Sequence, residues 1–382
     1  MNKEYLKKYC EVIIKAGVNL YEGQSLLINC GVRNFEFGLL LGQTAYEHGA
    51  KFVDLNLGSD YMRKFRIDNN KSTSDLEYIP NFALTKTNEI LANDWATIKI
   101  DNTEEIDVLK ATDSSKFQIM SKAEHQAFAH LSKSLTGFKN VWTIVAVPGT
   151  NWAGRILNTE ANAEAEDKLW EKIVPIMRLD AKDPAEAWRI HAETLVRRSK
   201  VLTEMNLDRL VFTAPGTELE VGINKTSVWK GGFATAINGR KFIPNLPTEE
   251  VFTTPDFKRT NGKVKVTKPV KVLETQLYGI WFEFKEGKVV NFGAYNNVEI
   301  LEKYFKTDEG ASYLGEVALV DGYSKVFESG LIFNSILYDE NAACHIALGR
   351  GFASCLSNGN DLNSNEQLKK GGCNYSLVHT DF

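Results

Sequence analysis

The fold is indicated first by a short apolar run, Ser25-Leu-Leu-Ile-Asn-Cys30. A stretch with helical apolar spacing, Tyr5 to Ala16, comes before this run, and a second one, Phe35 to His48, follows it. Another apolar run, Lys51-Phe-Val-Asp-Leu-Asn-Leu57, comes next. Strands that alternate with helices predict an α/β domain with a largely parallel sheet.

The rest of the N-terminal half extends this pattern. Residues Ser74 to Ile106 are expected to be helical with breaks, and Lys116-Phe-Gln-Ile-Met120 is expected to be a strand. The continuous apolar run Asn140-Val-Trp-Thr-Ile-Val-Ala-Val-Pro148 predicts a buried strand. Asp183-Pro-Ala-Glu186 then opens a long helix, with proline at the first helical position. We place the domain boundary there, which gives an N-terminal α/β domain of residues 1–185.

The sequence pattern changes in the C-terminal half, residues 186–382. Leu210 to Ile223 alternates apolar with polar residues, and Leu277 to Phe292 reads as two strands joined at Glu286-Gly-Lys288. Val298 to Phe305 has helical spacing. This half is therefore predicted to be an α+β domain with mostly antiparallel strands.

Bulk composition narrows the class of protein. A chain of 382 residues with 43% hydrophobic content can bury two cores, and a net charge of -4 without a basic stripe argues against a nucleic-acid partner. Apolar runs long enough for a signal peptide or a membrane span are missing, so we expect a soluble cytoplasmic protein. The five cysteines are odd in number and lack a Cys-x-x-Cys pair, which favours reduced thiols over disulfides or a structural zinc knot.

Four short segments of the C-terminal half carry residues that could bind a metal or catalyse a reaction. Their acidic and histidine residues are Glu249, Glu250, Glu316, His345, His379 and Asp381. His379 and Asp381 are two residues apart, so in a strand they share a face. Glu316 lies in an otherwise apolar run, where an unpaired carboxylate would cost several kcal/mol. Glu249 and Glu250 are adjacent and point to opposite faces of an extended backbone, so only one is expected to face the site.

Oxygen and imidazole ligands without cysteine suit zinc, cobalt or manganese, and a carboxylate-rich set suits two cations. Such a pair can activate a water for hydrolysis. Other enzyme classes lack their signals: the chain has no Gly-x-Ser-x-Gly elbow, His-Glu-x-x-His, phosphate loop or Gly-x-Gly-x-x-Gly after its first strand. His125 and His130 are spaced for surface positions, and Cys344 is adjacent to His345, a poor arrangement for a nucleophile and its base.

Four motifs resemble the aminopeptidase T family of metalloaminopeptidases, which includes aminopeptidase S and PepS. They are Pro244-Asn-Leu-Pro-Thr-Glu-Glu-Val-Phe-Thr-Thr-Pro-Asp256, Leu314-Gly-Glu-Val-Ala-Leu-Val320, Asp339-Glu-Asn-Ala-Ala-Cys-His-Ile-Ala-Leu-Gly349 and Val378-His-Thr-Asp-Phe382. The resemblance implies a cytoplasmic homodimer that removes single residues from the free N-termini of peptides. It also implies two divalent metal ions, commonly zinc or cobalt, with manganese or magnesium as alternatives. The implied ligands are Glu250, Glu316, His345, His379 and Asp381.

Two departures from the family pattern leave alternatives open. The family carries a catalytic tyrosine where this chain has Phe352, so either Arg350 or Tyr375 supplies the missing donor or the chain is an impaired, metal-binding homologue or scaffold. Relatives also continue beyond the His-x-Asp strand, which predicts a longer chain. Our mechanistic hypothesis assigns the proton-carrying role of general base to Glu249. A dinuclear amidase acting on non-peptide substrates is a further alternative.

Overall fold

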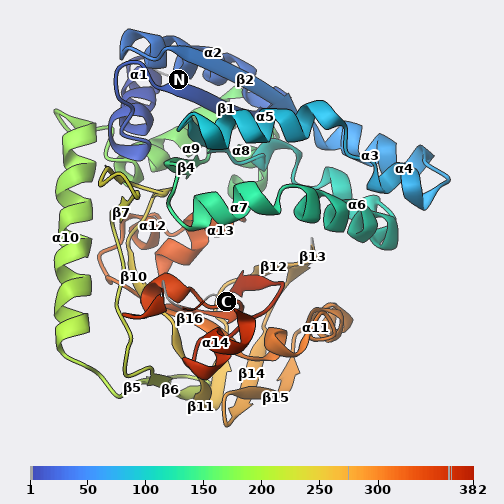
Figure 1. Ribbon diagram of the computed structural model, residues 1–382, viewed down its shortest axis with the longest axis vertical. Coiled ribbons are helices and arrows are strands. Elements are labelled where there is room, and N and C mark those ends of the chain that lie inside the picture. The colour runs from blue at the N-terminus through green and yellow to red at the C-terminus, as the bar shows by residue number, and fades with distance from the viewer. Residues whose placement is uncertain (1–2, 274, 360–361, 363) are drawn as a thin grey trace. The chain divides into compact units, whose positions relative to one another are not determined.

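The chain folds into two compact units in the computed structural model, which describes residues 3–273, 275–359, 362 and 364–382. Unit 1 comprises Met1–Ile190 and Phe233–Pro247, and unit 2 comprises His191–Gly232 and Thr248–Phe382. Figure 1 shows the course of the chain from the blue N-terminus to the red C-terminus. The chain leaves unit 1 shortly after the boundary proposed at residue 185, but it also returns to unit 1 for residues 233–247.

Unit 1 is built on one parallel sheet, as the alternation of strands and helices predicted. Its order is β2-β1-β3-β4-β9, and every neighbouring pair is parallel. The strands are β1 (Ser25–Gly31), β2 (Phe52–Gly58), β3 (Ala96–Ile100), β4 (Trp142–Val145) and β9 (Asn245–Leu246). Because β1 lies between β2 and β3, the direction in which successive strands are added reverses there.

Helices connect these strands. They are α1 (Lys3–Val12), α2 (Phe35–Glu47), α3 (Asp60–Asn69), α4 (Thr73–Glu77), α5 (Asn81–Ala92), α6 (Ser114–Ala127), α7 (Ala129–Thr136), α8 (Thr150–Leu157), α9 (Ala163–Ile176) and α10 (Pro184–Glu204), which continues into unit 2. A short π-helix, Ile13–Gly17, extends α1, and the two-residue strands β7 (Ala234–Thr235) and β8 (Lys241–Phe242) form a small hairpin. Among the described residues, no helix is both long enough and apolar enough to cross a membrane.

Two local predictions in unit 1 were wrong. The strand expected at Lys116–Met120 is part of α6, whose N-terminus is capped by the Asp113 carboxylate through the backbone N–H groups of Ser115 and Lys116. The segment expected to be helical up to Ile106 instead contains β3, which pairs with both β1 and β4. At β3, pairing with two neighbouring strands overrides the local helix propensity, and local spacing does not reveal such pairing.

Unit 2 contains two antiparallel sheets of four or five strands, besides a two-stranded one. One has the order β15-β14-β11-β6-β5 and the other the order β10-β16-β17-β18. The first is made of β5 (Arg209–Ala214), β6 (Thr217–Ile223), β11 (Pro255–Lys265), β14 (Trp281–Lys285) and β15 (Lys288–Gly293), and the second of β10 (Glu250–Thr253), β16 (Leu314–Val320), β17 (His345–Gly349) and β18 (His379–Asp381). The predicted hairpin at Glu286 and Gly287, and the predominance of antiparallel pairs, are confirmed.

The remaining elements of unit 2 are short. They are β12 (Val270–Val272), β13 (Thr275–Leu277), α11 (Val298–Phe305), α12 (Lys325–Glu328), α13 (Ile336–Asp339) and α14 (Asn365–Lys370). The helix predicted at Val298 to Phe305 is confirmed as α11.

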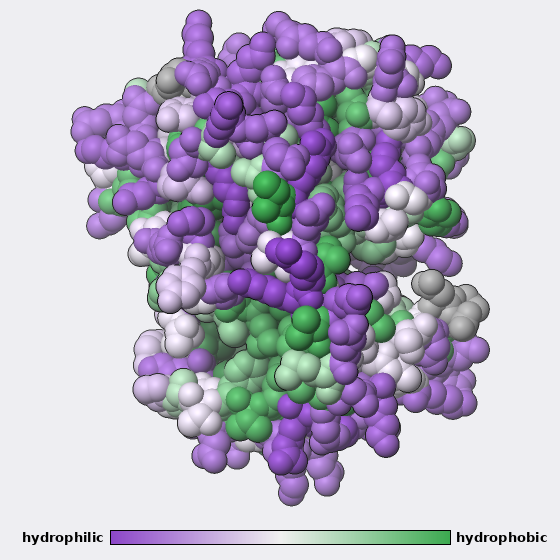
Figure 2. All heavy atoms as spheres, turned by 90° about the vertical axis from the view of Figure 1, so that its left-hand side faces the viewer, coloured by the Kyte–Doolittle hydropathy of each residue, from purple (hydrophilic) through white to green (hydrophobic). Residues whose placement is uncertain are grey.

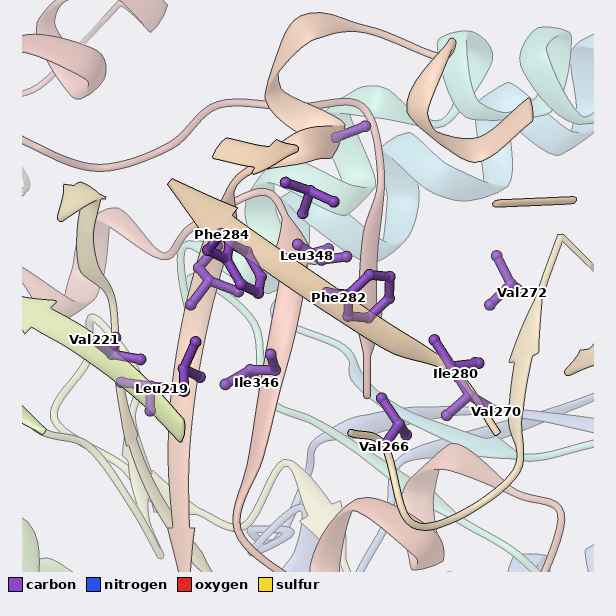
Figure 3. Packing of buried hydrophobic residues seen from close by; sticks show 14 of the residues in the cluster. Leu219, Val221, Val266, Val270, Val272, Ile280, Phe282, Phe284, Ile346 and Leu348 are labelled. Carbon is purple, nitrogen blue, oxygen red and sulfur yellow. The ribbon is translucent and has the colours of Figure 1, made fainter. Parts of the chain in front are cut away.

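One buried apolar cluster holds the two sheets of unit 2 together. Figure 3 shows Phe282 and Phe284 from β14 close to Ile346 and Leu348 from β17. All four side chains are at most 5% exposed. In β17 the intervening residues point the other way, so one face of the four-stranded sheet belongs to the core and the opposite face is available for polar groups.

Candidate metal centre

The ligands carried over from the family motifs lie on the polar face of the sheet β10-β16-β17-β18. Glu316 is paired with Ala347, which is paired in turn with Asp381 on the next strand. Glu250 is paired with Val320, two residues along β16 from Ala318. Since directly opposed residues of a sheet share a face, these carboxylates stand in neighbouring rows above it.

A β-bulge at Gly315 brings Glu316 to this face. Leu314 is opposite Leu348, but Glu316 is opposite Ala347, so Gly315 is the extra residue. Without the bulge, Leu314 and Glu316 would share a face; with it, Leu314 enters the core and Glu316 stands on the polar side. A Cβ at Gly315 would lie 2.2 Å from the Arg350 carbonyl oxygen, so the close approach requires glycine.

Small residues separate the ligands. His345 is paired with Ala318, and His379 with Gly349. Ala347 occupies the position between Glu316 and Asp381. Because none of these three small residues extends above the sheet, the ligand side chains lean over them toward one another.

The polar atoms of these side chains converge. His345 Nε2 lies 3.1 Å from Glu250 Oε2, and His379 Nε2 lies 3.2 Å from Glu316 Oε2 and 3.6 Å from Asp381 Oδ1. Two sets of possible metal-ligating atoms, each within 4.8 Å of one another, are Glu250, Glu316 and His345, and Glu316, His379 and Asp381. Glu316 belongs to both sets.

The imidazoles are oriented from behind by backbone carbonyls. His345 Nδ1 lies 3.1 Å from the Ala343 carbonyl oxygen, and His379 Nδ1 lies 2.7 Å from that of Arg350. A carbonyl oxygen can only accept, so it favours a proton on Nδ1 and leaves the Nε2 lone pair facing the carboxylates. That is the arrangement of histidines that ligate metals.

Buried charge gives the site a strong preference for cations. Burial raises the pKa of Glu316 to about 7, opposed in part by its hydrogen bond with His379. Burial alone would lower the pKa of His345 and of His379, but the hydrogen bonds and negative charges of Glu250, Asp381 and Glu316 outweigh it and raise both. Asp381 shows the reverse: burial favours a higher pKa, and the close imidazole of His379 brings it below its ordinary value.

One orphaned oxygen shows that a metal ion suits this donor set. Glu250 is 8% exposed, and its Oε2 accepts no hydrogen bond of acceptable geometry from any residue that the structure describes. His345 Nε2 lies 3.1 Å from it. A buried carboxylate oxygen and an imidazole nitrogen this close together are well suited to share a cation.

The sequence reasoning did not single out Glu340, which is coupled to this cluster. It lies in the 3₁₀ helix Glu340–Ala342, just before β17. Burial raises the pKa of its carboxyl well above the ordinary value, and the charges of Asp381 and Glu250 add to that effect. Its position in the motif Asp339–Gly349 could have indicated this, because that segment carries acidic residues close to the candidate ligand His345.

Glu249 lies outside both sets of ligand atoms. Its Oε2 is 3.2 Å from His191 Nε2, and its backbone N–H donates to Asn341 Oδ1 at 2.6 Å. It is 5% exposed. The two adjacent glutamates thus have different surroundings, one with His345 and the other with His191.

Phe352 lies against the cluster. Its ring centroid is 5.0 Å from that of His379 and 5.6 Å from that of Phe252. Of the two alternative donors, Arg350 is engaged: its Nε donates to the Ser376 carbonyl oxygen at 3.0 Å, and its guanidinium lies over the Tyr375 ring. An aromatic wall therefore stands beside the second set of ligands.

The other histidines and thiols considered from the sequence are separate from these ligand sets. His125 and His130 lie in α6 and α7 of unit 1. Cys344 is exposed, and its thiol points to the Val320 carbonyl oxygen. All five cysteines are free thiols, as predicted.

Comparisons with known proteins identify relatives of this chain. A family model described as thermophilic metalloprotease (M29) matches residues 2–382. The chain is 38% identical over 377 residues to aminopeptidase 2 of Geobacillus stearothermophilus, covering 99% of this chain and 91% of that relative. It is 32% identical over 381 residues to aminopeptidase PepS of Streptococcus thermophilus, covering 100% and 92%. The solved structure of wild-type AmpT from Thermus thermophilus superposes with a TM-score of 0.91 at 31% identity, covering 100% of this chain and 92% of that one.

Proposed function

This chain belongs to the thermophilic metalloprotease family M29 and is a metal-dependent aminopeptidase, and we propose that it binds two divalent cations to hydrolyse the first peptide bond of its substrates. The observation that carries this proposal is the place of Glu316 in both sets of ligand atoms. A carboxylate has two oxygens, so one residue can serve two neighbouring cations.

The residues that would hold the cations follow from the two sets. Glu250 and His345 would hold one, His379 and Asp381 the other, with Glu316 between them. Two imidazoles in a ligand set without thiolate favour zinc or cobalt, with manganese next and magnesium least suited.

The bound cations would supply Lewis acidity, lowering the pKa of an attacking water and polarising the scissile carbonyl. The chain itself would supply proton transfer. Glu340, a carboxyl whose pKa is raised by burial, is placed to pass a proton to the leaving amine. Glu249 remains the alternative carrier that we predicted from the sequence, and its contact with His191 would then relay the proton. The surplus of carboxylates also suits the positively charged amino terminus of a peptide.

The central test measures amino acids released from leucyl- and arginyl-peptides by protein with a measured metal content. We expect activity to disappear after chelation and to return with zinc or cobalt at two ions per chain. N-acetylated peptides should be inert, which separates an aminopeptidase from an amidase. Chelator-resistant turnover, or full activity with one ion per chain, would contradict the two-cation proposal.

The proton carrier is identified by a matched pair of variants, Glu340→Gln and Glu249→Gln. Each replacement keeps the size of the side chain and removes its ability to ionise. Loss of the true carrier should lower kcat by roughly 10²–10⁴-fold while the metal content stays at the wild-type value. Equal, near-wild-type kcat in both variants would exclude both residues from this role.

We also propose that the protein is a homodimer, and exposed apolar side chains of unit 2 support this. Figure 2 shows apolar atoms gathered in the lower half of the face that carries α10. The exposed large apolar side chains of unit 2 include Val201 on α10, Met205 just after that helix and Val211 on β5, at 55%, 59% and 62% exposure. A mass measurement on wild type and on Val201→Glu/Met205→Glu tests this, and a monomeric wild type would refute it.

The cytoplasm is the location that best suits five unpaired thiols, because disulfides are kept reduced there.

A further inference from the structure

The carboxyl edge of the parallel sheet in unit 1 has features that the peptidase centre does not use. In the order β2-β1-β3, the chain adds β2 on one side of β1 and β3 on the other, so the topological switch point lies between β1 and β3. In open parallel sheets, ligands bind outside the carboxyl ends of the strands at such a switch point. The segments that leave β1 and β3 there are Val32–Asn34 and Thr103–Glu105, with Asn102 between β3 and the latter.

Two amide oxygens at this point lack partners. Asn34 is 4% exposed, and neither its Oδ1 nor that of Asn102 accepts a hydrogen bond from any residue in the described part of the chain. Asn34 occupies the N-cap position of α2, yet its side chain makes no capping hydrogen bond. A buried acceptor without a donor destabilises the fold, so these oxygens require an explanation.

Both oxygens lie close to Gly31, on the side where another residue would carry its Cβ. A Cβ at Gly31 would lie 2.5 Å from Asn102 Oδ1 and 3.5 Å from Asn34 Oδ1. Any side chain at this position would therefore displace the Asn102 amide. The last residue of β1 thus forms a cradle between the two orphaned oxygens.

The other side of the Asn102 amide is strongly acidic. Asn102 Nδ2 lies 3.1 Å from Asp60 Oδ2 and 3.4 Å from Glu105 Oε2. Glu105 is 3% exposed, and Asp60 is 3.7 Å from Arg63, which is shared with Glu124 at 2.9 Å. Glu105 also accepts from the Asp60 backbone N–H at 2.7 Å and from Ser59 Oγ at 3.2 Å, so within this group the oxygens without a described donor are those of Asn34 and Asn102.

We propose that unit 1 binds a hard divalent cation, Ca²⁺ in particular, at Gly31, Asn34 and Asn102, with Asp60 and Glu105 supplying the balancing charge. All of these groups offer oxygen, and neither imidazole nor thiolate takes part, which is the opposite of the peptidase centre and favours Ca²⁺ over zinc. Ca²⁺ also tolerates irregular oxygen geometry, whereas Mg²⁺ demands an octahedron. The site would stabilise unit 1 and is independent of peptide hydrolysis.

The test titrates CaCl₂ into full-length protein whose peptidase centre is already loaded with zinc. Calorimetry should show one Ca²⁺ per chain, and Tm should rise by roughly 5 °C at a hundredfold excess over Kd. Asn34→Ala removes an oxygen that takes part in no hydrogen bond, so it should fold normally and bind Ca²⁺ at least tenfold more weakly. Peptide hydrolysis at 25 °C should be unchanged in this variant.

Three further variants make the result decisive. Asn56→Ala removes an exposed amide that is bonded to Asn29 at 2.9 Å, so Ca²⁺ binding should persist. Glu316→Gln weakens the peptidase centre, and Ca²⁺ binding should persist there too. Asn102→Asp adds a third carboxylate, so its Tm should be low in chelator and should rise more with Ca²⁺ than that of wild type. Absence of Ca²⁺ binding in wild type, equal binding in Asn34→Ala, or binding lost only in Glu316→Gln would overturn the proposal.

Discussion

Glu316 is the residue on which the proposed metal centre depends most. It is the single member common to both ligand sets, and it is 4% exposed. A buried carboxylate of this kind is stable only with compensating positive charge. Its geometry follows from one glycine, since the bulge at Gly315 turns it out of the core.

Replacing Glu316 by glutamine should therefore remove both cations together. The size of the side chain is preserved and its charge is lost, so we expect kcat/KM to fall by roughly 10³-fold or more, about the loss that follows removal of a preorganised charge from an active site. Metal analysis should show both ions weakened. Glu283→Gln, at an exposed position of β14, is the matched control and should behave as wild type. Retention of one tightly bound ion would argue against a shared ligand.

Position 352 tests whether catalysis needs a phenolic hydroxyl. Its ring contacts His379, so Phe352→Tyr would place a hydroxyl near the second ligand set. We expect little change in kcat, because the cations themselves can stabilise the developing oxyanion. A rise of roughly 10²-fold, typical of an added oxyanion donor, would instead support the impaired homologue. Unchanged metal content is the control for either result.

The five thiols should differ sharply in reactivity. Burial raises the pKa of Cys30 to about 11 and those of Cys10 and Cys373 to about 12, and it raises that of Cys355 further. A raised pKa keeps the thiol protonated and unreactive at pH 8. A thiol reagent should therefore titrate only the exposed Cys344 in native protein and all five after unfolding. Cys344→Ser should abolish the native reaction, and a second fast thiol would contradict this.

At the scale of single elements, β17 divides the core from the metal centre. Ile346 and Leu348 enter the apolar cluster, whereas His345 and Ala347 face the ligands. One strand therefore serves both purposes through its twofold periodicity.

Ala347→Val tests the space above the sheet. The added methyl groups would stand between Glu316 and Asp381, so we expect metal affinity and kcat to fall by tenfold or more with little loss of overall stability. Ile346→Val on the opposite face should cost about 0.5–1.5 kcal/mol of unfolding free energy and leave metal binding intact. Unfolding curves with metal analysis separate the two effects. Similar behaviour of both variants would show that the face assignment is wrong.

Periodicity and motifs predicted much of the fold, because they are local. Alternation places His379 and Asp381 together, and the run Ser25–Cys30 indicated the parallel sheet correctly. The segment Lys116–Met120 was predicted to be a strand, but it lies in a helix that is capped by Asp113 and packs Met120 into a buried cluster. Two features were missed: Asn245–Leu246 forms a strand of unit 1, and Glu340 lies close to the proposed metal centre. Both depend on contacts between distant segments, which local spacing does not encode.

At the scale of the whole molecule, metal removal should affect the two units differently. Each unit has its own sheets, and the proposed metal ligands all belong to unit 2. Chelation leaves several buried carboxylates facing one another, so amide hydrogen exchange should speed up in β10, β16, β17 and β18 and stay unchanged in β1 to β4. Mass spectrometry of peptides from both units measures this, with zinc re-addition as the control. Uniform loss of protection would show that the units unfold as one.

The position of β9 in the sequence affects how the chain folds during synthesis. β9 covers the outer edge of β4. Just before β9, the backbone N–H of Ile243 donates hydrogen bonds to the carbonyl oxygens of Ala16 and Gly17. A ribosome that has completed β4 must still translate the chain from Ala146 to Pro244, which takes roughly 5–20 s at about 5–20 residues per second. Throughout that interval the nascent sheet exposes an open edge that can pair with other chains. Translation arrest before Asn245 is therefore expected to leave aggregation-prone fragments that depend on ribosome-associated chaperones.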